Sequence, residues 1–206
     1  MLLLGECGGK VLYHSPGSKV PRKFHLYIEF EDDSFFTAMT QMWGAIEPYE
    51  QGKESDRKYL KGMRATPTEP GFTFEYFDGL RRNIGLEEKR SVKGLLTQDQ
   101  IIPGLGNAIA QDILFRARLH PRHPIADLTA GQTRVLYDAI LDTVAEVVEK
   151  DGRYDEYDLH NNRGGYIRIM DKNAVGRPGP DCGTAIEKIQ YLGGACHLCP
   201  VCQRLN

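Results

Sequence analysis

Residues 102–119 read IPGLGNAIAQDILFRARL, and this stretch decides the architecture of the chain. Its two glycines, Gly104 and Gly106, allow the backbone to turn sharply. A helix is predicted over 107–119, with one apolar side at Ile109, Ile113 and Leu114. The amides at the start of that helix carry no side chain in front of them, and Asn107 adds a side-chain donor, so the turn suits a phosphate group. A tight connection between two helices is the alternative interpretation.

Basic residues surround this turn. Lys93 precedes it, and Arg116, Arg118 and Arg122 follow it within reach of a duplex backbone. Lys and Arg outnumber Asp and Glu by 8 to 4 over residues 81–125 and by 6 to 3 over 160–206, whereas residues 126–159 hold 3 against 9. The net charge of the whole chain is only -2. The uneven distribution is typical of a protein with one positive face, although solvated helix surfaces also carry such charges.

Three cysteines near the end of the chain have the spacing of metal ligands. Cys182, Cys199 and Cys202 follow the pattern C-x16-C-x2-C, which predicts a zinc ribbon built on a hairpin. A fourth cysteine is expected at position 179, where Gly179 stands instead. The fourth ligand is then His197, which shares a strand face with Cys199, or Cys196, or water. A site without metal is the remaining alternative.

The rest of the chain reads as strands followed by helices. Strands are predicted at 10–14, 24–30 and 35–39, and the second alternates so that Phe24, Leu26, Ile28 and Phe30 should face a core. Residues 48–71 are polar and broken by prolines, as in a linker. Helices follow from residue 72, and Thr129 with Gln132 forms a capping box before the longest of them.

Composition narrows the class of protein. The chain has 206 residues, 41% of them hydrophobic, and four of its five cysteines lie within residues 182–202. A secreted disulfide framework would spread its cysteines along a short chain. No apolar run approaches the roughly 20 residues that span a bilayer. We therefore expect a protein without membrane association in a reducing, cytoplasmic location, and at the nucleoid if the source is bacterial.

These motifs together resemble a known family. Residues 91–97 (SVKGLLT), 103–107 (PGLGN) and 112–121 (DILFRARLHP) resemble the helix–two-turn–helix module of the formamidopyrimidine-DNA glycosylase / endonuclease VIII family. The segments CGTAI from Cys182 and CPVCQ from Cys199 resemble the zinc finger of the same family. The resemblance covers nearly the whole chain. It implies base-excision repair of DNA, in which a damaged base is flipped out of the duplex and the sugar is attacked by an amine.

The resemblance also exposes a departure at the front of the chain. The family's nucleophile is an N-terminal proline followed by glutamate, whereas this chain begins Met1-Leu2. Three explanations stay open: the true start lies upstream, the chain is a truncated paralogue that binds DNA without cutting it, or another amine acts. The weak candidates for that amine are the Met1 α-amino group and Lys93.

The resemblance implies further DNA contacts. Trp43 would wedge beside an unpaired base, and Arg163 with Tyr166 would contact a flipped base from a loop like the family's lesion-capping loop. An arginine that the family's zinc-finger hairpin usually presents to phosphates is replaced by Gly194. For Trp43 a core position is the alternative, and for the loop a flexible Gly-rich connection.

We therefore predict an α+β protein. Residues 1–50 form part of a truncated N-terminal β-sandwich, 51–71 a linker, 72–160 a helix–two-turn–helix DNA-binding domain, and 161–206 a lesion-loop-like segment with a zinc-ribbon β-hairpin. The predicted function is binding of duplex, damaged DNA, with an AP lyase or a zinc-stabilised protein-interaction module as alternatives. The exposed sheet edge predicts a homodimer.

Overall fold

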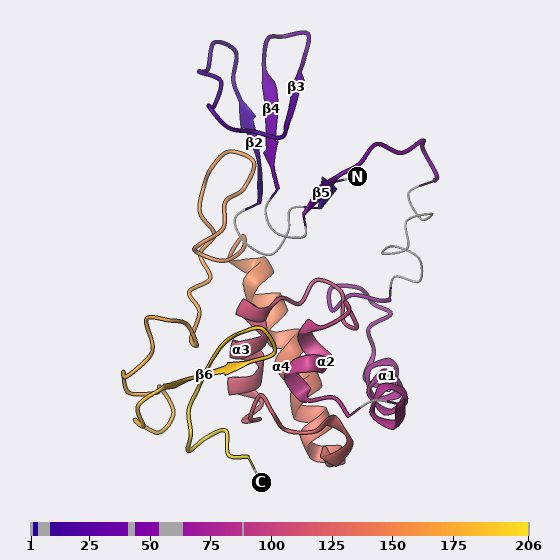
Figure 1. Cartoon of the computed structure of the whole chain (residues 1–206), viewed down its shortest axis with the longest axis vertical. Helices are drawn as coiled ribbons and strands as arrows, with labels where there is room; N and C mark the ends of the chain where they lie inside the picture. The colour runs from indigo at the N-terminus through magenta and orange to yellow at the C-terminus, as the bar shows by residue number, and fades with distance from the viewer. Residues whose placement is uncertain (1, 4–8, 41–43, 54–63, 88, 206) are drawn as a thin grey trace. The chain divides into compact units, whose positions relative to one another are not determined.

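A computed structural model describes residues 2–3, 9–40, 44–53, 64–87 and 89–205 (Figure 1). In the described part of the chain, the strands are β1 (Leu2–Leu3), β2 (Lys10–His14), β3 (Leu26–Glu29), β4 (Phe35–Met39), β5 (Ala45–Ile46), β6 (Glu187–Tyr191) and β7 (Gly194–Leu198). The helices there are α1 (Phe74–Glu87), α2 (Val92–Thr97), α3 (Asn107–Arg116), the 3₁₀ helix η2 (Ile125–Asp127) and α4 (Ala130–Glu149). This α+β composition confirms the predicted fold class. None of the described helices is long and apolar enough to cross a membrane.

The chain groups into two compact units. The first combines residues 1–63 with 147–167, and the second combines 64–146 with 168–206. Each unit therefore draws on two separate stretches of sequence. The predicted boundaries at residues 50, 71 and 160 stay a prediction.

The first unit contains an antiparallel sheet in the order β2-β4-β3. Val11 and Leu26 both pair with Ala38, and Ile28 pairs with Phe36. Residues two apart in a strand point to the same side, so these five residues share one face of the sheet. The prediction of a core-facing β3 is wrong in one respect. Phe24, Ile28 and Phe30 are exposed by 39%, 44% and 42%, and Ile28 lines an open hollow of about 560 Å³ over that face.

Two helices of the second unit have side-chain caps at their starts, and the second of these caps is the one that the sequence predicts. The Ser91 side chain accepts a hydrogen bond from the Gly94 amide at the start of α2. Before α4, the Gln132 amide donates to Thr129 Oγ1 at 3.2 Å and the Thr129 amide donates to Gln132 Oε1 at 2.9 Å. This reciprocal pair is the predicted capping box. The core between the helices consists of fully buried apolar side chains, among them Phe77, Leu95, Ile102, Ile113, Leu136 and Ile140.

One helix prediction needs correction, and the buried side of another helix is narrower than its sequence suggests. Helix α3 ends at Arg116, three residues before the predicted Leu119, because Arg118 adopts the left-handed conformation with φ of 55°. In α4, Leu136 and Ile140 are buried but Val135 and Val148 are exposed by 47% and 61%. The buried stripe of α4 is therefore narrower than its apolar sequence suggests.

A hairpin completes the second unit. Strands β6 and β7 pair antiparallel from Glu187↔Leu198 to Tyr191↔Gly194, with Leu192 and Gly193 in the turn at φ of 50° and 73°. Strand β7 contacts α3 (Figure 1). The hairpin therefore lies beside the helix that begins at the glycine turn.

Candidate functional site

The start of α3 is open. Gly106 is the N-cap residue of this helix, is exposed, and no side chain makes a capping hydrogen bond there. A Cβ atom added to Gly106 would meet no other atom within 4 Å. The first amides of a helix have no partners within the helix, and no side chain caps them here, so they are available as donors beside an unobstructed Gly106. The preceding Gly104 has φ of 84°, which a residue with a side chain rarely adopts.

Asn107 and Gln111, one helical turn apart, fasten the hairpin to α3. Asn107 Nδ2 donates to the carbonyl oxygen of Ala195 at 3.3 Å, and Gln111 Oε1 accepts from the His197 amide at 2.7 Å. Gln111 Nε2 donates to the Asn107 carbonyl at 3.1 Å, which fixes the orientation of the Gln111 amide. Sequence analysis missed Gln111, and its position four residues after Asn107 was the available signal.

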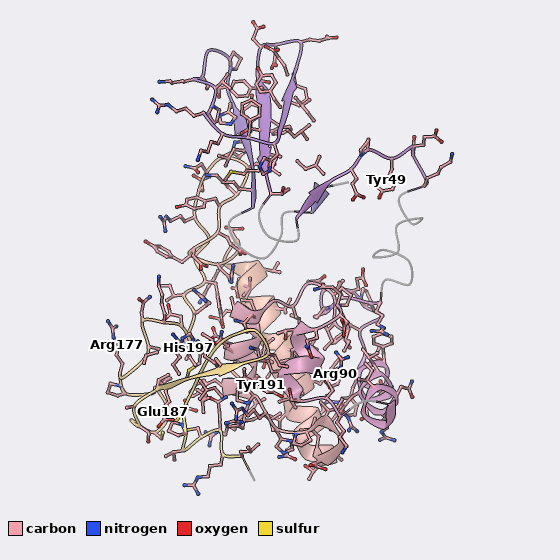
Figure 2. All side chains as sticks on the ribbon, in the orientation of Figure 1. Tyr49, Arg90, Arg177, Glu187, Tyr191 and His197 are labelled. Carbon is pink, nitrogen blue, oxygen red and sulfur yellow. The ribbon has the colours of Figure 1, made fainter. Side chains whose placement is uncertain are left out.

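His197 belongs to this hydrogen-bond network and not to the metal site. Its Nδ1 lies 2.7 Å from Gln111 Oε1, which accepts only, so Nδ1 carries the proton. Burial lowers the pKa of His197, which keeps the ring neutral. Its Nε2 is buried without a hydrogen-bond partner among the described residues. Figure 2 shows His197 and Tyr191 on the hairpin beside the helices.

Lys93 is buried, with 2% of its surface exposed. Its ammonium group donates to the carbonyl oxygen of Tyr191 at 2.6 Å, at the end of β6. This position differs from the exposed amine that a direct phosphate contact requires. Lys93 here holds the turn of the hairpin against α2.

The arginine at the end of α3 and the two that follow the helix differ in their surroundings. Arg116 forms an ion pair with Glu146 of α4 and is half-buried. Arg118 is 67% exposed, with its guanidinium 3.5 Å from Asp181. The exposed Arg122 lies over the ring of Tyr191, 5.2 Å from its centroid, and donates to the Gln190 carbonyl at 3.4 Å. Of the three, Arg118 and Arg122 present positive charge to solvent.

Three cysteines converge at the base of the hairpin. Their sulfur atoms lie within 4.8 Å of one another, with Cys182 Sγ 3.4 Å from Cys199 Sγ. A tetrahedral zinc ion with Zn–S bonds of about 2.3 Å separates its sulfurs by about 3.8 Å. The donor set and its spacing therefore fit a zinc or similar soft metal ion. Hydrogen bonds from Thr184 lower the pKa of Cys182 to about 7, whereas the shared hydrogen bond with Cys182, together with burial, raises the pKa of Cys202 to about 12.

The two candidates for the fourth ligand lie elsewhere. Among the described His, Cys, Asp and Glu residues, the group contains the three cysteines alone. His197 is held by Gln111, and Cys196 Sγ lies 4.0 Å from the Tyr191 carbonyl oxygen. Successive residues of β7 point to opposite faces of the hairpin, so Cys196 lies towards the Tyr191 carbonyl and His197 towards Gln111 of α3.

The remaining predicted residues lie in the first unit or outside the described residues. The Arg163 guanidinium lies 5.0 Å from the ring centroids of both Tyr154 and Tyr157 and is exposed. Tyr166 is only 1% exposed, which differs from the accessible ring that the sequence predicted. Its backbone pairs with Gly152 and Tyr154, so the segment forms an ordered bridge rather than a free loop. Met1 and Trp43 fall outside the described residues.

Known proteins of one family resemble this chain in sequence. The profile of the formamidopyrimidine-DNA glycosylase H2TH domain matches residues 65–156. The formamidopyrimidine-DNA glycosylase of Listeria innocua is 27% identical over 202 residues, which cover 95% of this chain and 72% of the relative. That of Lactobacillus delbrueckii is 29% identical and covers 90% of this chain and 68% of the relative.

Solved structures show the same fold. The complex of Lactococcus lactis Fpg with DNA containing an abasic site has a TM-score of 0.83 at 21% identity, covering 97% of this chain and 73% of that one. The MutM (Fpg) protein of Thermus thermophilus has a TM-score of 0.78 at 26% identity, covering 98% and 78%.

Proposed function

Because this chain belongs to the formamidopyrimidine-DNA glycosylase family, we propose that it binds duplex DNA through the phosphate backbone, with damaged duplexes preferred. The observation that carries the proposal is the start of α3, where no side chain caps the first amides and the space around Gly106 is open. A phosphate placed there accepts from several amides at once and meets the positive end of the helix. In a bacterial cell such a protein would work at the nucleoid.

The residues around α3 supply the rest of a phosphate-binding surface. Exposed Arg118 and Arg122 add long-range attraction on the same unit. Asn107 and Gln111 keep the hairpin beside the helix start. We further propose that zinc bound by Cys182, Cys199 and Cys202 staples the base of that hairpin, since structural zinc contributes directly to folding.

Salt-dependent binding tests this function. Three phosphate contacts, at the α3 start, Arg118 and Arg122, predict a log–log slope of about -2.7 between affinity and salt. Affinity for a fluorescent duplex should then fall about 40-fold between 50 and 200 mM salt. Anisotropy titrations with intact duplex and with a duplex containing an abasic-site analogue provide the measurement. An affinity that is independent of salt, or no affinity at 50 mM, would exclude the proposed phosphate contacts.

A second candidate function is the DNA glycosylase activity named in the relatives, to which the family resemblance adds an AP-lyase step. The buried position of Lys93 and its bond to the Tyr191 carbonyl argue against this lysine as the attacking amine. An amine must be unprotonated and close to the sugar to form a Schiff base. Borohydride trapping on an abasic duplex tests for such an adduct. If no species is trapped, DNA binding without lyase chemistry is the function that remains.

The alternative to DNA binding is a protein-interaction module. The open sheet face of the first unit is the feature that favours this alternative. Leu26, Ile28 and Phe36 line the hollow there, and β3 is an edge strand of the sheet. We keep the homodimer as a proposal on this basis. Light scattering decides it, since a mass of one chain, 23.2 kDa, at all concentrations would reject the dimer.

A further inference from the structure

The cysteine site lacks a fourth ligand from the described part of the chain. Tetrahedral structural zinc sites are closed by four protein ligands, whereas a site with three keeps one position for an outside ligand. Here no other described His, Cys, Asp or Glu places a ligand atom with the three sulfurs. Asp181, next to Cys182, has its carboxylate 3.5 Å from the Arg118 guanidinium.

Gly179 occupies the place from which a fourth ligand would come. Its amide donates to the Thr184 carbonyl at 2.8 Å and its carbonyl accepts from Gly183 at 3.0 Å, so the turn that carries Cys182 is complete without a side chain at 179. A Cβ atom at Gly179 would point at Ile186 Cδ1, 3.0 Å away. Ile186 packs in one cluster with Cys199 and Cys202. A side chain at 179 would therefore enter the neighbourhood of the metal site.

The site is also accessible. Cys182 is exposed and Cys202 is partly exposed, whereas Cys199 is fully buried. An ion held by the three sulfurs thus has its closed side on Cys199 and its open side towards solvent near Cys182. A small molecule can reach that side without any movement of the hairpin.

We propose that the metal ion held by Cys182, Cys199 and Cys202 keeps one exchangeable coordination position, and that this position binds a small external thiolate. The inference rests on the proposed metal site and extends it. A soft ion with three thiolate ligands favours a fourth soft donor over water. Gly179 supplies no ligand atom of its own, and Cys182 is exposed, so an external thiol would approach the three sulfurs from the side of Cys182.

Cobalt substitution tests this directly on the full chain. The intensity of the thiolate-to-cobalt absorption reports the number of Co–S bonds. In thiol-free buffer the chain should show three, and titration with 2-mercaptoethanol should raise the intensity to saturation by about one-third as a fourth bond forms. No change on adding thiol, or loss of the absorption because the metal is stripped, would overturn the proposal.

Variants at position 179 provide the matched comparison. Gly179→Cys should show the higher intensity before any thiol is added, should not respond to thiol, and should hold the metal at least about 10-fold more tightly. Gly179→Ala adds the same Cβ without sulfur and should respond to thiol like the parent chain. A Gly179→Cys variant that still responds would contradict the inference. If that variant does not fold, the thiol titration of the parent chain still decides.

Failure of this proposal is distinguishable from failure of the proposed function. If the parent chain retains no cobalt, the metal site and the exchangeable position both fail. Duplex affinity measured on the same preparation reports the α3 site separately. A chain that binds DNA and retains cobalt but ignores thiol would overturn the inference alone.

Discussion

Replacement of Gly106 by aspartate should weaken duplex binding by about 10- to 100-fold, or about 1.4–2.7 kcal/mol, without loss of stability. Gly106 is the N-cap of α3, and a side chain there has free space. Aspartate is a favoured N-cap residue, so its carboxylate should accept from the first amides of α3 and stabilise the helix by a few tenths of a kcal/mol up to about 1. The same carboxylate then occupies the donors that phosphate needs and repels the phosphate.

The prediction is decisive because Gly106→Asp should change stability and duplex affinity in opposite directions. Most substitutions that weaken binding also destabilise the fold, and the two effects are then difficult to separate. Gly106→Asp should raise the urea midpoint while lowering the affinity for duplex in anisotropy titrations. Gly106→Asn is the matched control, because it caps the helix without negative charge and should lose much less affinity. Equal affinities of the aspartate variant and the parent chain would show that phosphate does not bind at the start of α3.

Much of the fold could be predicted from local sequence. The glycine turn at 104–106, the Thr129 cap and the clustering of the three cysteines were predicted from short sequence patterns, and all appear in the structure. Such features depend on backbone conformation and short-range hydrogen bonds, which local sequence specifies. They were sufficient to locate α3 and the hairpin.

The surroundings of the site depend on contacts between distant residues. Lys93 bonds to Tyr191, 98 residues away, and Gln111 bonds to His197, 86 residues away. A basic residue near a candidate phosphate site predicts an exposed contact, but for Lys93 the packing of the hairpin turn decides otherwise. His197 was expected to share a strand face with Cys199, but β7 ends at Leu198 and the His197 ring meets Gln111 of α3, a contact that no local pattern reveals. Tyr166 and the exposed face of β3 differ from expectation for the same reason.

A second large effect is expected at Asp112, on the buried side of α3. Its carboxylate is fully buried and accepts from the amides of Ile169 at 3.0 Å and Met170 at 2.7 Å. Met170 is fully buried in the cluster that contains Cys199. Asp112 therefore joins the helix of the proposed DNA site to the segment that leads into the cysteine site.

Asp112→Ala should destabilise the chain by about 2–5 kcal/mol, because two amides lose their acceptor and each unpaired buried donor costs about 1–3 kcal/mol. Urea unfolding measures the loss, and duplex affinity should fall at temperatures where the hairpin loosens. Asp112→Asn keeps the shape and one acceptor oxygen, so it should fall between the parent chain and the alanine variant. Asp138→Ala is the control, since Asp138 of α4 is 49% exposed and its ion pair with Arg134 is worth less than about 1 kcal/mol. If Asp112→Ala cost no more than Asp138→Ala, the buried carboxylate would not be what holds residues 169–170 on α3.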